Sequence, residues 1–320
     1  MKFIRFTLAA LTLLFLAQCS VSMGPSISKL DYAPGNTSSG WIKTKIIKGN
    51  VFIPVTVNGH RVLAMLDSGT QRTTIPANLA KSFGVHTNGH LTVQSYGGNV
   101  RSSFGTKIDV KIGAMNYELF RPAVEPMVVQ IRQEFPFKFI ILGEDVFLKD
   151  VIEFDFSKQQ LRFAPPAPTG VKKSPADSLS SLIMINKTLT IPGSITGGPT
   201  GYFEIDTGDA NICALYKNNS KIKKWLKIHP NLTERPFKTV TVIGGGGAYQ
   251  TTLIRIKQMK MLGANFNKFP CSVTNAPTND PRVIGSIGLS LMRIFNATFD
   301  YPARKIYFKP ELKSGSQMPD

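Results

Sequence analysis

The chain has 320 residues, of which 42% are hydrophobic and 18% are charged, and lysine and arginine outnumber aspartate and glutamate by 38 to 20. This composition excludes an intrinsically disordered chain, and the length is enough for two compact lobes. The net charge of +18 indicates an anionic partner, either a nucleic acid or a charged membrane surface. Because no compact basic cluster is interleaved with aromatic residues, we expect no nucleic-acid partner and retain an anionic membrane surface.

The N-terminus has the pattern of a secretion signal. Lys2 and Arg5 precede an apolar run over residues 6–17, which is too short to span a bilayer. We therefore expect residues 1–22 to be a signal peptide and the mature protein to be exported, either to the periplasm or to the medium. The run ends in Leu-Ala-Gln-Cys, which resembles a bacterial lipobox, so lipidation at Cys19 and anchoring to the bacterial envelope are the alternative to cleavage near Ser22.

Few residues suit a metal site or a disulfide. His86 and His90 are separated by the turn residues Asn88-Gly89, so we predict no metal and no cofactor. Once Cys19 is removed or lipidated, Cys213 and Cys271 remain. They either form a disulfide in an oxidising compartment or stay as two buried free thiols.

Short β-rich runs separated by turn residues dominate the rest of the chain. Residues 51–57 and 62–66 flank Asn58-Gly59, which is a strong hairpin signal. We read residues 23–40, rich in Gly, Pro and Ser, as a flexible leader, and the Pro-rich break near the middle as an interlobe linker over 166–180. The predicted units are therefore an N-terminal lobe over 41–165 and a C-terminal lobe over 181–310, followed by a tail over 311–320.

The two predicted lobes share an internal repeat. Gly143 and Phe154 are 11 positions apart, as are Gly288 and Phe299, and the same spacing continues without a gap through the next strand of each copy. Each copy also has an Asp-Ser/Thr-Gly motif upstream of this segment. The chain therefore has the pattern of two copies of one β-rich lobe.

The two motifs, Asp67-Ser68-Gly69 and Asp206-Thr207-Gly208, each follow an apolar run typical of a strand. One such motif alone is explained by a β-turn, whereas two copies at equivalent places in a repeat favour a shared function. Two carboxylates held close together share one proton, because both cannot ionise easily. The ionised member can take a proton from water while the protonated member polarises a carbonyl.

With these motifs the sequence resembles the aspartic peptidases of the pepsin and retropepsin superfamily, and most closely the bacterial retropepsin-like proteins with two fused lobes. The resemblance covers roughly residues 41–310. It implies an all-β fold of two homologous barrel-like lobes with the active-site cleft between them. It also implies a monomeric aspartic endopeptidase that cleaves peptide or protein substrates with Asp67 and Asp206.

Supporting roles follow from the same resemblance. The hydroxyls of Ser68 and Thr207 would hydrogen-bond across the lobe interface, and Gly69 and Gly208 would allow the tight loops. Thr70 fits a hydroxyl that orients the carboxyl pair. A further element of the family, two apolar residues followed by Gly, falls at Gly143 in the first copy and at either Gly285 or Gly288 in the second.

The second copy departs from the pattern, because Asp209 stands where the first has Thr70. A third carboxylate near the pair would raise its pKa values, unless Asp209 points outward and caps a turn, which is the interpretation we favour. The departure supports an alternative function, a non-catalytic peptide- or envelope-binding protein with the same fold.

Two glycine-rich segments are candidates for flaps, the hairpins that close over a substrate. The candidate flap residues are Tyr96, Gly97 and Gly98 in the first copy, and Gly245, Gly246, Gly247 and Tyr249 in the second. Each segment can equally be an exposed hairpin loop. The glycine run has neither the dinucleotide-binding nor the phosphate-loop spacing.

Overall fold

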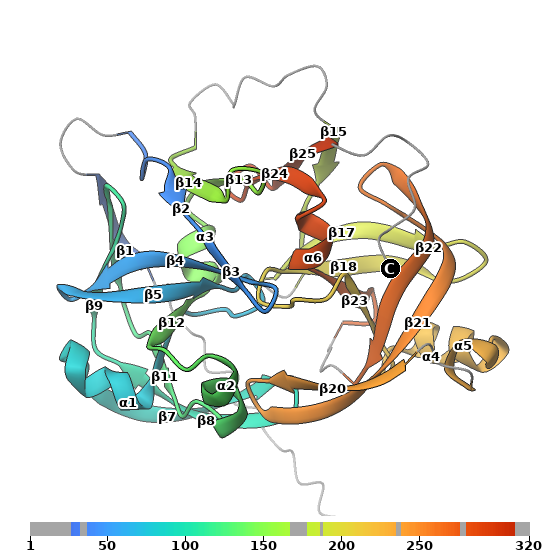
Figure 1. The fold of residues 1–320 in the computed structure, drawn as a ribbon, viewed down its shortest axis with the longest axis horizontal. Coiled ribbons are helices and arrows are strands. Elements are labelled where there is room, and N and C mark those ends of the chain that lie inside the picture. Colours follow the sequence, from blue (N-terminus) through green and yellow to red (C-terminus); the bar gives the residue numbers. More distant parts are fainter. Residues whose placement is uncertain are drawn as a thin grey trace, which may run out of the picture.

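The computed structural model describes residues 27–32, 37–166, 178–185, 188–234, 238–275 and 280–310. The predicted signal peptide with Cys19, most of the predicted linker and the tail over 311–320 lie outside the described residues. Within them the chain forms two β-rich lobes side by side, shown in blue to green and in yellow to red (Figure 1). The predicted all-β fold class is confirmed. No helix among these residues has the length and apolar character needed to cross a bilayer.

The N-terminal lobe, lobe 1, is built on one eleven-stranded sheet. Its strands are β1 (Ile27–Tyr32), β3 (Lys45–Ile47), β4 (Asn50–Val57), β5 (His60–Leu66), β6 (Thr74–Pro76), β7 (Thr87–Ser95), β8 (Gly98–Gly105), β9 (Ile108–Ile112), β10 (Met115–Leu119), β11 (Ala123–Glu125) and β12 (Phe139–Leu142). Four short helical segments accompany them, namely α1 (Ala77–Ala80), η1 (Lys81–Phe83), α2 (Val129–Glu134) and α3 (Glu144–Phe147). The strands alternate as half-buried strands do, since Ile108, Val110 and Ile112 of β9 are buried while Asp109 and Lys111 are exposed.

Part of the segment predicted as a flexible leader is instead a strand. β1 pairs antiparallel with β10, with Leu30 opposite Tyr117 and Tyr32 opposite Met115. The Gly, Pro and Ser residues that suggested flexibility stand mainly at the two ends of the segment, whereas its middle, Ile-Ser-Lys-Leu-Asp-Tyr, carries the apolar residues. Without β1, the backbone N–H and C=O groups along one edge of β10 would lack partners in the sheet, and β1 supplies them. Composition alone does not reveal such an edge.

The C-terminal lobe, lobe 2, is built on an eight-stranded sheet. Its strands are β16 (Ile183–Ile185), β17 (Thr188–Ile195), β18 (Thr200–Asp206), β19 (Cys213–Tyr216), β20 (Lys238–Gly244), β21 (Gly247–Met261), β22 (Ala264–Thr274) and β23 (Val283–Gly288). The helices are α4 (Ser220–Ile228), α5 (Asn231–Glu234) and α6 (Leu289–Met292). Asn219 caps α4 by accepting from two backbone N–H groups, and the helix buries Ile222, Trp225 and Leu226 against the sheet.

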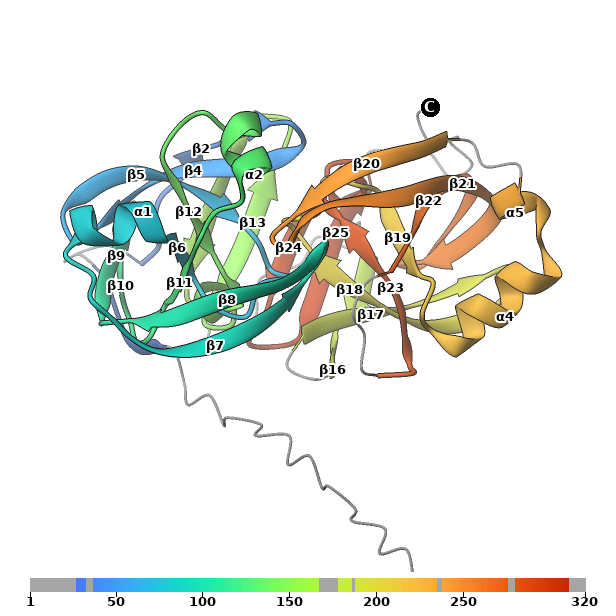
Figure 2. The same cartoon turned by 90° about the horizontal axis from the view of Figure 1, so that it is seen from below.

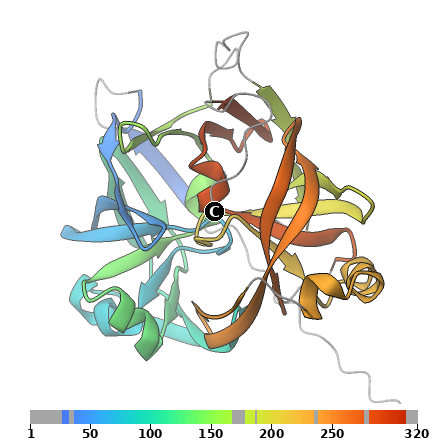
Figure 3. The same cartoon turned by 45° about the vertical axis from the view of Figure 1, so that its right-hand side comes forward.

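A third sheet, of six strands, joins the two lobes. Its strands are β2 (Ile42–Lys43), β13 (Val151–Asp155), β14 (Gln160–Ala164), β15 (Ser178–Ser181), β24 (Phe295–Asp300) and β25 (Lys305–Pro310). β13 and β24 belong to the two copies of the repeat and pair antiparallel with each other, with Ile152 opposite Phe299. The helices α3 and α6 that precede these strands lie together in the middle of the molecule (Figures 1 and 3). The repeated segments therefore form the centre of the fold.

Gly288, and not Gly285, is the equivalent of Gly143. Gly143 and Gly288 each have an extended backbone conformation, and each directly precedes a short helix. A Cβ on Gly143 would collide with the Arg72–Thr73 backbone, and one on Gly288 would collide with the backbone carbonyls of Asp209 and Asn211. Both positions need glycine because the loop that carries an Asp motif passes directly over them.

Candidate active site

Asp67 and Asp206 occupy equivalent positions at the ends of parallel strands. Asp67 directly follows β5, and its backbone N–H donates to the carbonyl of Leu142 at 3.0 Å. Asp206 ends β18 and lies opposite Gly288 of β23. The strand that precedes each motif therefore delivers its aspartate to the centre of the molecule, between the lobes.

The structure brings the two carboxyl groups into direct contact. The Asp67 side chain hydrogen-bonds to Asp206. A Cβ added to Gly69 would lie 2.7 Å from Cγ of Asp206, and one added to Gly208 would collide with the Asp67 carboxyl. Each carboxyl thus lies against the glycine of the opposite motif, and any side chain at either glycine would push the pair apart.

Ser68 and Thr207 together make four hydrogen bonds that cross the interface between the lobes, next to the carboxyl pair. The Ser68 N–H donates to Oγ1 of Thr207 at 2.9 Å, and the Thr207 N–H donates to Oγ of Ser68 at 3.1 Å. The Ser68 hydroxyl then donates to the carbonyl of Ile205 at 2.8 Å, and the Thr207 hydroxyl donates to that of Leu66 at 3.1 Å. Both hydroxyls are buried, so this reciprocal set fixes the two loops relative to each other.

The two aspartates differ in their remaining partners. Asp67 accepts from the Gly69 N–H at 2.9 Å and from the Thr70 hydroxyl at 3.1 Å. One oxygen of Asp206 accepts from the N–H groups of Gly208 and Asp209, at 3.0 and 3.1 Å. Lobe 1 therefore supplies a hydroxyl donor where lobe 2 supplies only backbone donors.

The expectation that Asp209 points outward is wrong. Its carboxylate does cap a turn, because it accepts from the backbone N–H and the side-chain amide of Asn211 at 2.9 and 2.7 Å. The carboxylate is nevertheless only half exposed and lies close enough to raise the pKa of Asp206. Its own pKa is also raised, first by burial. The hydrogen bonds from Asn211 hold the Asp209 carboxylate beside the pair.

Burial is the main influence on the titration of the pair. It raises the pKa of both aspartates above the ordinary value, and the hydrogen bonds from Thr70 and Gly69 partly offset this for Asp67. The pKa of Asp206 is raised further by the negative charges of Asp67, Asp209 and Glu204. The pair therefore holds a shared proton more readily at the Asp206 side.

Two further carboxyl groups near the pair were not identified from the sequence. Glu204 lies two residues before Asp206, on the same face of β18, and accepts from the Tyr216 hydroxyl at 2.5 Å. Glu125 of β11 lies close enough for the charge of Asp67 to raise its pKa, although burial is the larger cause. The period of two along a strand could have pointed to Glu204, but Glu125 is distant in sequence and carries no local signal.

The two candidate flaps are hairpins whose tips meet. β7 and β8 form one hairpin, β20 and β21 form the other, and Figure 2 shows them converging from the two lobes. The Gly246 N–H donates to the carbonyl of Tyr96 at 2.9 Å. A Cβ on Gly97 would collide with Gly247, and one on Gly246 would collide with Gly98. The glycines are therefore needed for this close approach of two backbones.

Aromatic side chains reinforce the contact between the flaps. The rings of Tyr96 and Tyr249 stack with their centroids 5.8 Å apart. The Tyr96 hydroxyl donates to that of Tyr216 in lobe 2 at 3.2 Å, and Tyr96 packs against the buried cluster of lobe 2 that includes Tyr216, Ala214 and Val283. Gly245, the remaining predicted flap residue, lies in the turn between β20 and β21, against the Ser95 hydroxyl. The tip of the first candidate flap therefore contacts buried residues of lobe 2.

Cys213 and Cys271 are both free thiols and both buried. They lie next to each other, since Ala214 pairs with Ser272 one step further along β19 and β22, and interaction with Cys213 adds to the effect of burial in raising the pKa of the Cys271 thiol. Of the two alternatives drawn from the sequence, the structure has the free thiols. Among the described residues there is no group of three or more His, Cys, Asp or Glu side chains arranged to hold a metal.

Comparison with known proteins bears on lobe 1. Residues 53–144 match a family model described as aspartyl protease. The match extends from β4 through the first Asp motif to the start of α3, and it supports a relationship to aspartyl proteases. A search of curated proteins found no match. The internal repeat gives lobe 2 the same arrangement of strand, aspartate and glycine.

Proposed function

We propose that this protein is an aspartic endopeptidase of the two-lobed, retropepsin-like type, which hydrolyses peptide bonds with water activated between Asp67 and Asp206. The observation that carries the proposal is the contact between these two carboxyl groups, each placed by its own lobe and each resting on the glycine of the other. The match of residues 53–144 to the aspartyl protease family supports the reaction class.

The asymmetry around the pair supports a different role for each aspartate in this proposal. Asp67, which accepts from the Thr70 hydroxyl and the Gly69 N–H, is the member that ionises first and removes the proton from water. Asp206, surrounded by other carboxylates, keeps the proton and donates a hydrogen bond to the scissile carbonyl. As water attacks the carbonyl carbon, Asp206 transfers its proton to the carbonyl oxygen, which gives a neutral tetrahedral intermediate with two hydroxyls. When the C–N bond then breaks, the proton taken by Asp67 passes to the leaving amine, and one hydroxyl of the intermediate returns a proton to Asp206 as the new carboxyl group forms.

The substrate in this proposal is an extended peptide in the cleft beneath the two flaps. An extended chain can hydrogen-bond with its backbone to the flap hairpins as an added strand. Closure of the tips through Gly97, Gly98, Gly246 and Gly247 would then exclude bulk water from the carboxyl pair. Glu125 and Glu204 make the surroundings of the pair acidic despite the basic composition of the chain, which favours cationic over acidic peptides.

The decisive test uses Asp67→Asn and Asp206→Asn, measured on a degenerate fluorogenic peptide library over acid to neutral pH. Each substitution keeps the shape of the side chain but removes the shared proton. We expect loss of nearly all turnover in both variants, and inhibition of the unmodified protein by a statine-type mimic of the tetrahedral intermediate. Asp109→Asn makes the same substitution on the exposed face of β9, outside the flaps, and serves as the matched control that should retain full activity.

A non-catalytic peptide-binding protein is the alternative outcome of the same measurement. It is supported by Asp209, whose charge beside the pair raises the pKa of Asp206. Such a protein would show no turnover at any pH and would bind peptides equally well with and without the Asp substitutions. Turnover that survives in either Asn variant would refute the peptidase mechanism.

The cellular location is a separate proposal that rests on the N-terminal sequence. Lys2, Arg5 and the apolar run that follows suit export, and Cys19 suits a lipid anchor on the bacterial envelope. In this proposal the protein acts as a monomer, and its basic surface can contact an anionic membrane. Metabolic labelling with a fatty acid in the intact protein and in Cys19→Ala distinguishes an anchored protein from one released after cleavage.

A further inference from the structure

The outward face of α4 carries charge of one sign. The helix buries its apolar side chains against lobe 2 and turns lysines outward. We refer to these as the α4 lysines, which are Lys217 just before the helix and Lys221, Lys223, Lys224 and Lys227 within it, all exposed. No aspartate or glutamate occurs between residues 217 and 233. The sequence itself therefore supplies no negative charge to this face.

The fold does not neutralise the α4 lysines either. Among the described residues none of them forms an ion pair with a carboxylate, and their one side-chain hydrogen bond runs from Lys221 to a backbone carbonyl of β18 at 3.2 Å. Asp280 lies near the start of the helix, because Asn219 donates to the carbonyl of Pro281. Asp280 is itself paired with Arg282 at 2.7 Å, so its charge is already balanced.

The stability of the helix does not explain this arrangement. Lys224 is three residues from both Lys221 and Lys227, and Lys223 is four residues from Lys227, so these side chains are neighbours on the helix surface. Like charges at these spacings destabilise a helix, and Lys221 also stands in the first turn, where the helix dipole favours a negative charge. A face that only had to remain in water would be better served by charges of both signs. The lysines therefore indicate an anionic partner.

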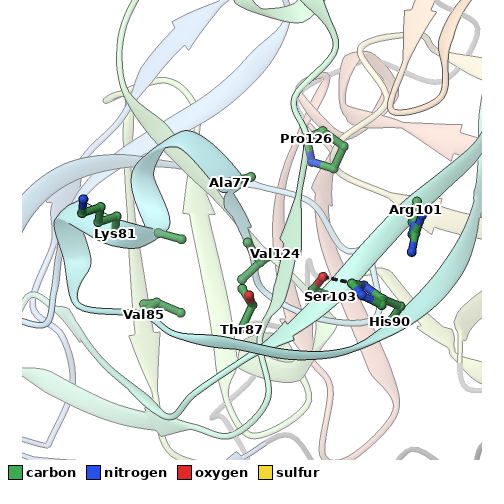
Figure 4. A pocket seen from close by; sticks show the side chains of 10 residues that line it. Ala77, Lys81, Val85, Thr87, His90, Arg101, Ser103, Val124 and Pro126 are labelled. Atoms are coloured by element: carbon green, nitrogen blue, oxygen red, sulfur yellow. Dashed lines mark hydrogen bonds between the residues drawn. The ribbon is translucent and has the colours of Figure 1, made fainter.

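The internal repeat shows that the fold does not require a basic helix at this place. Thr74 begins β6 and Cys213 begins β19, and each lies seven residues after the aspartate of its motif. The helical segment that follows is α1 with η1 in lobe 1 and α4 in lobe 2. Lys81 is the one lysine of the lobe 1 segment. Figure 4 shows it beside a hollow of about 390 Å³, with Arg101 on the opposite side, so positive charges do not gather there.

The position of α4 allows contact with a large partner. The helix lies at the outer end of lobe 2, on the side away from lobe 1 (Figures 1 and 2). The two flap hairpins instead converge between the lobes, where the carboxyl pair lies. A partner that contacts α4 from outside therefore leaves the hairpin tips uncovered.

The residue types on this face favour a membrane over a nucleic acid. Trp225 is buried, so the helix offers no exposed aromatic ring on which a base could stack, and it has no arginine to read base edges. Lysine is a compact charge that is attracted to the phosphates of an anionic bilayer. Ile228, which follows Lys227 at the end of α4, is 64% exposed and can enter the apolar boundary below the headgroups.

We propose that the α4 lysines and Ile228 form a docking surface for a bilayer that contains anionic phospholipids. The ammonium groups would contact headgroup phosphates, and Ile228 would lie among the headgroups beside them. This proposal assigns the membrane contact suggested by the basic composition to one surface. It depends neither on peptidase activity nor on lipidation at Cys19.

The test measures co-sedimentation of the mature chain, residues 23–320, with lipid vesicles, so that neither the signal peptide nor a lipid anchor contributes. One set of vesicles is phosphatidylcholine with about one third phosphatidylglycerol, and the other is phosphatidylcholine alone. We expect binding to the anionic vesicles that weakens as salt is added, and binding to the neutral vesicles that is at least about 100-fold weaker. Absence of binding to the anionic vesicles, or equal binding to both sets, would overturn the proposal.

Two triple variants locate the surface. One combines Lys223→Gln, Lys224→Gln and Lys227→Gln, which removes three charges from α4 and relieves the repulsion between them. Each lysine close to an anionic bilayer contributes roughly fivefold to binding, so this variant should bind the anionic vesicles about 100-fold more weakly, with a thermal midpoint no lower than that of the unmodified protein.

The matched control removes the same charge from exposed positions of lobe 1, by Lys81→Gln, Lys111→Gln and Lys138→Gln. It should bind the anionic vesicles within about 3-fold of the unmodified protein, because these lysines lie away from α4. Equal weakening in the two triple variants would show that binding follows net charge alone and would refute the surface. Tighter binding to duplex DNA than to the anionic vesicles, lost with the α4 lysines, would assign the surface to a nucleic acid and refute the membrane as its partner.

Discussion

Glu144 should make the stability of this protein depend on pH. It is the first residue of α3, is only 3% exposed and lies at the interface between the lobes, where its carboxyl accepts from the backbone N–H of Leu189 in β17. Its other oxygen has no hydrogen-bond partner among the described residues. Burial, with smaller contributions from the charges of Asp145 and Glu204, raises the pKa of Glu144 from 4.5 to about 8.

The sign of the effect follows from where the proton is held. The unfolded chain releases the Glu144 proton near pH 4.5, whereas the folded protein keeps it until about pH 8. The folded state is therefore favoured most at acid pH, and this contribution is lost as the pH rises towards 8 and through it. The difference in pKa corresponds to about 5 kcal/mol at most, of which roughly 3 to 4 kcal/mol would be lost between about pH 5 and pH 8.

Glu144→Gln removes this dependence while keeping the shape of the side chain and an oxygen for the Leu189 N–H. Urea unfolding of the protein and of the variant at about pH 5 and pH 8 gives the two changes in the free energy of unfolding. We expect similar stability at acid pH and a variant that is more stable than the unmodified protein by roughly 3 kcal/mol at pH 8. Asp150, whose pKa burial raises to about 7, contributes equally to both proteins and cancels in the comparison.

The control is Glu134→Gln, which changes a half-exposed glutamate at the end of α2 and should leave the pH dependence of stability as it is in the unmodified protein. If Glu144→Gln loses as much stability as the unmodified protein between the two pH values, Glu144 does not hold a proton at the lobe interface. The reasoning about its burial would then be refuted.

Three further substitutions test the geometry of the site. Thr207→Val removes two buried hydrogen bonds between the lobes and should lower the free energy of unfolding by about 2 to 4 kcal/mol. The exposed control Thr92→Val should lower it by less than about 0.5 kcal/mol. Equal losses in the two variants would contradict a stabilising role for the interlobe bonds. Gly246→Ala places a methyl group against the Gly98 backbone of the opposite hairpin tip. If the proposed peptidase closes through these tips, the substitution should lower kcat/KM about 10-fold with an unchanged thermal midpoint. An unchanged kcat/KM would show that catalysis does not require contact between the tips. Asp209→Asn removes a negative charge that raises the pKa of Asp206. The alkaline limb of the pH–activity profile should therefore move to lower pH. Movement to higher pH would refute this electrostatic account.

The sequence was sufficient for the features that repeat. Strand alternation, hairpin signals and the shared spacing of Gly143 and Gly288 predicted an all-β fold, which is confirmed. The same repeat placed Asp67 and Asp206 at equivalent strand ends, and the structure brings these ends together at the lobe interface. These features depend on patterns of neighbouring residues, which are visible in one chain.

The features that the sequence did not reveal depend on contacts between distant segments. β1 is a strand because β10 has an edge for it, and Glu125 is near Asp67 because β11 pairs with β8 and β6. The side chain of Asp209 stays beside the carboxyl pair because Asn211 holds it there, which residue type and position do not indicate. Such outcomes require knowledge of which strands become neighbours.

Both lobes carry the strand, aspartate and glycine of the repeat, but the loops that follow the two aspartates differ. Lobe 1 has Thr70 as a donor to its aspartate and fills the space behind the loop with Arg72 and Asp145. Lobe 2 has a third carboxylate beside its aspartate and a cavity behind the loop. One loop is therefore fixed by a filled interior, whereas the other depends on short local hydrogen bonds to Asn211 and Ser290.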